Sequence, residues 1–293
     1  MADSAARKAR RIRRIKEEIR DFTFVLPAII IFTIIIVIPL ISGIRFTFTD
    51  WNGMSKKINY VGFQNYIKVF SDKDLLKPIM NTAIFTTVTT VVINVLGLAL
   101  AIMAVKEFRG VNVIKSIIFI PLVVSLVLVS YMWMYVYSDF FGILGWSSPL
   151  IKARTALIGI CIMAIWKEVG LEMIIYLAAL KGVSQDYYEA ATIDGAGFWA
   201  ILKHVTLPMI APAFTYCIPL CIANGLRMYD YAYVATGGGP NHATESMAFY
   251  IYQYLFPFNK VGYGQTVAVL YLIFSIALSQ VVTRLLRKRE IEL

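Results

Sequence analysis

Charged residues are scarce in this sequence. Only 16% of its 293 residues are Asp, Glu, Lys or Arg, whereas 59% are hydrophobic. A soluble globular chain carries about 25% charged residues and cannot hide so much apolar surface. The shortage of charge therefore excludes an ordinary soluble domain and indicates a membrane protein.

Cysteine and histidine are scarce as well. The three cysteines, Cys161, Cys217 and Cys221, lie in apolar runs without the spacing of a metal site. The two histidines, His204 and His242, are far apart in the chain. No Gly-rich stretch carries the Lys-Ser/Thr pair of a nucleotide-binding loop. The sequence therefore predicts no catalytic site, no metal and no bound cofactor in this chain, so that it is not itself an enzyme.

Long apolar runs, by contrast, are abundant. A membrane-spanning helix needs about 20 mostly apolar residues, and six stretches meet this requirement: Phe22–Ile44, Pro78–Val105, Ser116–Ser138, Thr155–Leu180, Val205–Leu226 and Val261–Thr283. The fourth stretch contains Lys167, Glu168 and Glu172, which is unusual because charges within a span are costly. The predicted fold class is an all-α integral membrane protein with six transmembrane helices.

Basic residues are unevenly distributed along the chain. They cluster at Arg7–Arg20, Lys106–Lys115 and Arg284–Glu290, and such clusters stay in the cytosol by the positive-inside rule. Six spans return the chain to its starting side, so both termini are predicted to be cytoplasmic. The basic residues flank spans instead of forming an aromatic-laced patch, so no nucleic-acid partner is expected. Contact with anionic lipid is an alternative role for the first cluster.

The chain is therefore predicted to have three parts. A basic cytoplasmic segment (1–21) precedes a membrane domain (22–283), and a short cytoplasmic tail (284–293) follows it.

Three prolines recur in the fifth span, which we expect to bend beside a cavity. The stretch "TGGGPNHAT", Thr236–Thr244, is expected to be a turn-rich outer loop. Trp133 and Tyr137 are expected to lie at the membrane–water boundary.

A polar stretch, "SQDYYEAATIDGAGFWAILKHVTLP", interrupts the apolar sequence at residues 184–208. Ser184 suits a helix N-cap, and Asp194-Gly195 is a turn signal. Between them, Ala190 and Ala191 are small enough for a partner to approach closely, and Glu189 offers an acceptor there. The pattern predicts a short helix–turn–helix, which serves either as a docking element for another protein or as a surface connector only.

The spacing in this stretch resembles that of the EAA loop of bacterial ABC importer permeases. Glu189-Ala190-Ala191 is followed after three residues by Gly195, and after nine more by Val205-x-Leu207-Pro208. The family usually has isoleucine where this sequence has Val205. The stretches "VGFQNYIKVF", "NTAIFTT", "YLAALKGVSQDYYEAATIDGAG" and "YVATGGGPNHAT" are similar to the maltose-type permeases of sugar importers. The resemblance covers nearly the whole chain.

This resemblance implies a type I ABC importer permease fold in the bacterial cytoplasmic membrane. Residues 184–208 would be the coupling loop, which docks into a cytoplasmic ATPase subunit; its coupling residues would be Glu189, Ala190, Ala191, Asp194, Gly195, Leu207 and Pro208. The implied partners are a homologous second permease subunit, two ATPase subunits that bind ATP and magnesium, and an extracytoplasmic solute-binding protein. Pairing with a second permease as a heterodimer follows from the family branch, whereas the sequence alone also permits a homodimer.

Polar groups within the spans mark the expected solute pathway. Glu168 and Glu172 are four residues apart and share one helix face, and Asn224, Arg227 and Tyr231 are predicted to share a face of the fifth span. The resemblance to the maltose-type family implies that Glu168, Leu171, Asn224, Arg227 and Met228 line the solute site. The complete predicted set is Trp166, Glu168, Leu171, Glu172, Asn224, Arg227, Met228, Tyr229 and Asp230. A structural ion pair between Arg227 and either glutamate is the alternative.

The sequence therefore favours an importer permease for a carbohydrate, with an oligosaccharide as the expected solute. Arg227 leaves open another solute, such as glycerol phosphate or an amino acid. An ion-coupled secondary transporter or channel using Lys167, Glu168 and Glu172 is the alternative from a different class. The EAA spacing argues against it, because such a carrier needs no ATPase docking loop.

Overall fold

The structure is a computed structural model that describes residues 20–106, 108–288 and 290. Most of the predicted basic cytoplasmic segment, including Arg7, lies outside the described residues, as does much of the tail after Lys288. Within the described residues every regular element is a helix, apart from one isolated bridge between Thr49 and Tyr60. The predicted all-α class is confirmed.

The first half of the chain begins with a helix over Arg20–Phe46. It continues with shorter elements around one long helix. They are η1 (Thr33–Val37) and α2 (Ile38–Phe46) within the first helix, then α3 (Gln64–Ser71), η2 (Lys73–Leu75), α4 (Leu76–Val105), α5 (Val111–Val123), α6 (Leu126–Tyr135), η3 (Val136–Phe140), α7 (Phe141–Ile143) and η4 (Pro149–Ile151).

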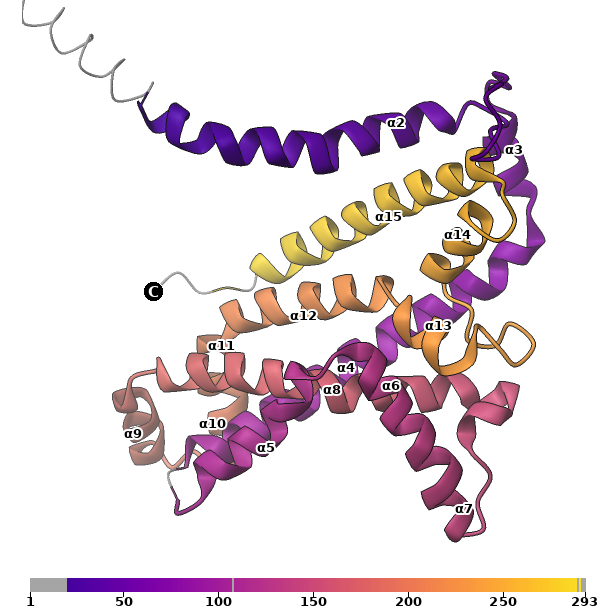
Figure 1. Ribbon diagram of the computed structural model, residues 1–293. Coiled ribbons are helices and arrows are strands. Elements are labelled where there is room, and N and C mark those ends of the chain that lie inside the picture. Colours follow the sequence, from indigo (N-terminus) through magenta and orange to yellow (C-terminus); the bar gives the residue numbers. More distant parts are fainter. Residues whose placement is uncertain (1–19, 107, 289, 291–293) are drawn as a thin grey trace, which may run out of the picture.

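The second half holds two long helices with short helices between them. Its elements are α8 (Ala153–Lys181), α9 (Gln185–Ile193), α10 (Phe198–Ile201), η5 (Leu202–Thr206), α11 (Leu207–Met209), α12 (Ala211–Leu226), α13 (Asp230–Thr236), α14 (Met247–Leu255) and α15 (Val261–Arg287). In Figure 1 the ends of α8 and α15 and the start of α12 lie at the same end of the molecule as α9.

Among the described residues, four helices are long and apolar enough to cross a membrane, and a bent pair makes a fifth if it is counted as one span. The four are Arg20–Phe46, Lys73–Val105, Leu126–Ile143 and Val261–Arg287. The helix α8 has 29 residues, a length of about 44 Å at 1.5 Å per residue. Lys167, Glu168 and Glu172 lower the hydropathy of its middle, yet its length suffices for the sixth span.

The third predicted span is not one helix. The stretch Ser116–Ser138 is interrupted where Val124 and Ser125 adopt extended conformations, with ψ angles of 137° and 145°. Pro121 lacks a backbone N–H, and the Ser125 hydroxyl accepts a hydrogen bond from Leu128 N (3.3 Å) and so caps a new helix. In Figure 1 α5 and α6 meet at an angle at this break.

The fifth span bends, as its prolines predict. The helical stretches Phe198–Met209 and Ala211–Leu226 meet at Ile210 with an angle of 74°. Pro208 lies near the end of the first stretch and lacks a backbone N–H. Pro212 lies in the first turn of the second stretch, where a proline removes no helical hydrogen bond. The bend lies at the end of the span next to residues 184–208.

The helix of the fifth span ends before Arg227 and Tyr231, two residues of the face predicted for it. Helix α12 stops at Leu226, the residues Arg227, Met228 and Tyr229 form a connector, and α13 begins at Asp230. The prediction that Asn224, Arg227 and Tyr231 share one continuous helix face is therefore wrong. A local pattern cannot reveal such an interruption, because residues 222–233 contain neither proline nor a Gly pair.

Two apolar clusters pack against α8, on either side of its charged stretch. One includes Ile160, Met163 and Ala164, and the other includes Met173, Tyr176 and Leu180. Helices α4, α5 and α12 cover these parts of α8. The charged residues 167–172 thus lie between two packed cores, which positions them in the middle of the bundle.

Tyr137 belongs to the first of these clusters. It is only 1% exposed, and its hydroxyl donates a hydrogen bond to Gly159 O (3.0 Å). Tyr137 is therefore a packed core residue, and its position at the membrane–water boundary stays a prediction. The three cysteines are buried and free, as expected for small core residues.

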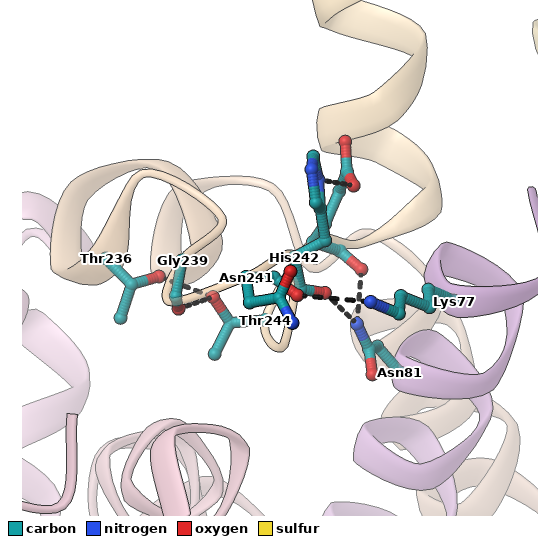
Figure 2. Close-up of polar contacts among 8 residues, drawn as sticks. Lys77, Asn81, Thr236, Gly239, Asn241, His242 and Thr244 are labelled. Atoms are coloured by element: carbon teal, nitrogen blue, oxygen red, sulfur yellow. Dashed lines mark hydrogen bonds and ion pairs between the residues drawn. The ribbon is translucent and has the colours of Figure 1, made fainter. Parts of the chain in front are cut away.

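The predicted outer loop Thr236–Thr244 is tied to α4 (Figure 2). Lys77 Nζ donates to Asn241 O (3.3 Å), and Asn81 Nδ2 donates to His242 O (3.0 Å) and to Glu245 O (2.9 Å). Positive φ angles at residues 237 and 238 confirm the turn-rich character of the loop. The helices α13 and α14 on either side were not predicted.

Candidate functional sites

A cavity of about 470 Å³ opens in the middle of the bundle. Its walls come from the break between α5 and α6, from the charged stretch of α8, and from the connector between α12 and α13. The lining residues are Leu122, Val123, Val124, Ser125, Leu126, Lys167, Glu168, Leu171, Glu172, Asn224, Arg227, Met228, Tyr229, Asp230 and Tyr231. Every predicted pathway residue except Trp166 is among them.

Two different structural reasons bring these residues together. On α8, Lys167, Glu168, Leu171 and Glu172 recur at spacings of three and four residues, which puts them on one face. Opposite them, Asn224, Arg227, Met228 and Tyr229 follow one another at the end of α12, and Asp230 begins α13. Trp166 points elsewhere and contacts Trp133 edge to face, with ring centroids 5.8 Å apart.

Arg227 does not form the alternative ion pair. Among the described residues, ion pairs within 4.0 Å join Arg20 to Asp21 and His242 to Glu245. Neither involves Arg227, Glu168 or Glu172. The Arg227 side chain is exposed at the cavity, so its guanidinium donors are available to a solute.

Glu172 lies at the base of the cavity within a buried polar cluster. It is 1% exposed, and its Oε1 accepts a hydrogen bond from Cys221 Sγ (3.1 Å). Asn94 Nδ2 donates to the same sulfur (3.4 Å), and Tyr176 OH donates to Asn94 Oδ1 (2.5 Å). The second oxygen of Glu172 and the hydroxyl of Tyr231 have no partner among the described residues.

Sequence reasoning did not assign Asn94, Tyr176 and Cys221 to this region. The signal that indicates them is a buried amide within an otherwise apolar span, since such a group needs a hydrogen-bonding partner. The cavity as a whole combines carboxylates, an amide, a guanidinium and phenols. These groups hydrogen-bond to hydroxyl groups as donors and as acceptors.

The second candidate site is the stretch 184–208, which forms the predicted helix–turn–helix. Ser184 Oγ accepts a hydrogen bond from Asp186 N (3.4 Å) at the start of α9. At its end, Gly195 has φ +78°, Gly195 N donates to Thr192 O (3.0 Å), and Ala196 N donates to Ala191 O (2.9 Å). This pair of bonds is a Schellman cap, in which glycine adopts the left-handed conformation at low cost.

Helix α9 lies at the surface of the chain. None of its residues is buried, Glu189, Ala190 and Asp194 are exposed, and Ala191 is half-buried. Leu207 and Pro208, both half-buried, form the entry to the fifth span.

Three large apolar side chains that were not assigned from the sequence are also exposed on this stretch. Ile193 is 86% exposed, Phe198 is 60% exposed and Trp199 is 77% exposed. Apolar residues within a polar stretch are the sequence signal for such a surface. Contiguous exposed apolar side chains are typical of surfaces that contact a partner protein or a membrane.

Comparison with protein families matches residues 93–291 to the family described as binding-protein-dependent transport system inner membrane component. The chain is 29% identical over 292 residues to the probable starch degradation products transport system permease protein AmyD of Thermoanaerobacterium thermosulfurigenes, covering 97% of this chain and all 100% of the relative. It is 31% identical over 268 residues to an osmoprotective compounds uptake permease protein of Synechocystis, covering 85% and 92% of the two chains.

A further relative is the multiple sugar-binding transport system permease protein MsmF of Streptococcus mutans, 27% identical with 96% and 99% covered. Among solved structures, a chain of a bacterial ABC transporter that imports the acidic polysaccharide alginate superposes with a TM-score of 0.82 at 20% identity, covering 95% of this chain and 99% of that one. This similarity establishes the fold, a type I ABC importer permease.

Proposed function

We propose that this chain, which belongs to the family of binding-protein-dependent transport system inner membrane components, carries a carbohydrate through the polar cavity beside α8. The observation that carries the proposal is the cavity itself. It lies between packed cores, and its carboxylates, amide and guanidinium suit the hydroxyl groups of a sugar. The names of AmyD and MsmF, which specify starch degradation products and multiple sugars, support this solute class.

The chain would act in alternating access with partner subunits. A homologous permease subunit would complete the pathway, two ATPase subunits would bind ATP and magnesium, and an extracytoplasmic protein would deliver the solute. One solved structural relative is a transporter in complex with a solute-bound periplasmic protein, which supports the last of these partners. The second permease is proposed to be a different, homologous chain.

Residues 184–208 would transmit ATPase closure to the spans. Glu189, Ala190 and Ala191 would contact the ATPase, and Gly195 would fix the angle between α9 and α10. The exposure of Ile193, Phe198 and Trp199 supports a docking role, because a mere connector has no need of three exposed large apolar side chains. Leu207 and Pro208 would pass the movement to α12 through the bend at Ile210.

Uptake into proteoliposomes tests the proposed function. We expect the complete transporter with its binding protein to take up a radiolabelled neutral oligosaccharide in an ATP-dependent manner, and we expect an ionophore to leave the rate unchanged. Uptake that is abolished by the ionophore and does not depend on ATP would instead identify an ion-coupled carrier.

The proposed topology places residues 184–208 in the cytoplasm and residues 46–75 outside. We expect an impermeant thiol reagent applied to intact cells to label Lys56→Cys and to leave Lys203→Cys unlabelled. Both positions are exposed, and the three native cysteines are buried, so the background is low. Labelling of Lys203→Cys in intact cells would overturn the topology and the coupling proposal together.

A second prediction concerns ATP hydrolysis. The purified chain, free of partner subunits, is expected to release no phosphate from ATP above the buffer level, because its sequence has no Gly-rich loop with a Lys-Ser/Thr pair. The complete complex serves as the positive control. Turnover by the pure chain that persists through a further purification step would contradict the assignment of hydrolysis to partners.

A further inference from the structure

The break between α5 and α6 leaves a backbone group without a helical partner. Val124 and Ser125 are extended and line the cavity. In a continuous helix Leu122 O would accept from the N–H four residues later, but no backbone N–H of the described chain donates to it. Within a membrane such backbone groups are tolerated only where the protein or cavity water satisfies them.

Lys167 supplies the missing donor. Its Nζ lies 3.0 Å from Leu122 O and donates a hydrogen bond to it, and the residue is only 9% exposed. The C-terminal end of a helix carries a partial negative charge, so an ammonium group there is favourable. The cation of Lys167 is therefore engaged by the end of α5, although the residue lies at the cavity wall.

Helices α5 and α8 also approach each other closely next to this contact. A Cβ atom added to Gly170, three residues after Lys167, would lie only 2.5 Å from Ile118 O. The backbones of α5 and α8 therefore touch at Gly170, and this contact brings the end of α5 within reach of the lysine. Lys167 and Gly170 together fix one wall of the cavity against α8.

We propose that Lys167 is a positioning residue, which holds the unwound segment 122–125 against α8 so that the cavity keeps its solute-binding shape. The proposal rests on the proposed function, because it takes the cavity as the solute pathway. Lys167 acts through the segment and does not itself bind the solute. Without the lysine the segment leaves this position for part of the time, and the apparent affinity falls by the fraction of time spent away.

The test uses the complete transporter in membranes and two measurements. The first measures the rate at which N-ethylmaleimide modifies Val124→Cys, a half-buried cavity position, and it requires no solute. We expect Lys167→Met to increase this rate several-fold, and Lys167→Arg to restore it because arginine retains a charged donor. Lys152→Met removes an exposed lysine at the start of the same helix, and it should leave the rate unchanged.

The second measurement is uptake of radiolabelled maltotriose as a probe oligosaccharide. The half-saturating concentration is expected to rise about tenfold in Lys167→Met, which is the effect expected from the loss of one charge-assisted hydrogen bond. The maximal rate is expected to change less. A role in general stability would instead lower the amount of transporter and leave its half-saturation unchanged. If Lys167→Met does not accumulate, Lys167→Gln, which is uncharged and shorter, replaces it in both measurements.

An unchanged rate of Val124→Cys modification in Lys167→Met, or in Lys167→Gln where it replaces that variant, would overturn the proposal. The two measurements also distinguish a failure of this proposal from a failure of the proposed function. If Lys167→Met accelerates modification while Glu168→Gln leaves uptake normal, the positioning contact stands and the solute pathway lies elsewhere. If Glu168→Gln impairs uptake while Lys167→Met changes neither measurement, the pathway stands and the positioning role is wrong.

Discussion

Glu189→Lys is expected to abolish solute transport and solute-stimulated ATP hydrolysis while the subunit remains in the membrane. Glu189 is exposed on α9, a helix without buried residues, so the substitution does not disturb the chain's own packing. The new cation would instead face the donor groups that Glu189 meets on the ATPase, and like charges at a desolvated contact cost several kcal/mol. Capture of the ATPase subunit and ATP hydrolysis in liposomes measure the two effects.

Gly195→Val is expected to have the same result through the backbone. Gly195 has φ +78° within the Schellman cap of α9, and a β-branched residue is strongly disfavoured at such an angle. Asparagine tolerates the left-handed conformation, so Gly195→Asn is the matched control and should retain most transport. The solute cavity should keep its affinity in each variant, because residues 172 to 181 of α8 separate it from the loop by about 14 Å.

Normal ATPase capture and coupled transport by Glu189→Lys would reduce residues 184–208 to a connector. The assignment of the coupling surface would then fail, although the family membership would not. If Gly195→Asn loses transport together with Gly195→Val, the sensitivity arises from the exposed turn surface and not from the backbone angle.

Glu168→Gln and Arg227→Ala are each expected to lower transport at least about tenfold, the effect of about 1.4 kcal/mol, with normal insertion and complex assembly. Both side chains line the cavity, and each offers hydrogen-bonding groups that a hydroxylated solute can use. Initial rates of uptake and the amount of assembled complex should be measured on the same membranes. Asp74→Asn, at an exposed carboxylate far from the cavity lining, is the control.

The double variant Glu168→Ala, Arg227→Ala separates this role from an ion pair. Removing one partner of a buried ion pair leaves an uncompensated charge, which costs about 3–5 kcal/mol, and removing both relieves that cost. The structure forms no such pair within 4.0 Å. We therefore expect the double variant to transport no better than either single variant. Recovery of assembly in the double variant would restore the ion-pair explanation, and normal transport would remove both residues from the pathway.

The sequence by itself determined the class of the protein and the position of each predicted span except the third, which the structure interrupts at Val124 and Ser125. A shortage of charge and six long apolar stretches leave few alternatives, because each backbone polar group in a membrane must be satisfied, and a helix does this within one segment. The helix–turn–helix at residues 184–208 was equally predictable, since Ser184 and Gly195 cap α9 through bonds to their own neighbours. The spacing of Lys167, Glu168, Leu171 and Glu172 on α8 likewise follows from helix periodicity.

Only the tertiary structure decided how these helices are interrupted and what faces the cavity. At the break after α5, the partner of Leu122 O is Lys167, which lies 45 residues away in the chain. Distant partners also occur at the end of α12, where Leu226 O accepts from Tyr271 OH, and at Tyr137, whose hydroxyl donates to Gly159 O. Periodicity reports which side chains share a face of one helix, but it carries no information on which other segment supplies the partner of a freed backbone group or a buried hydroxyl.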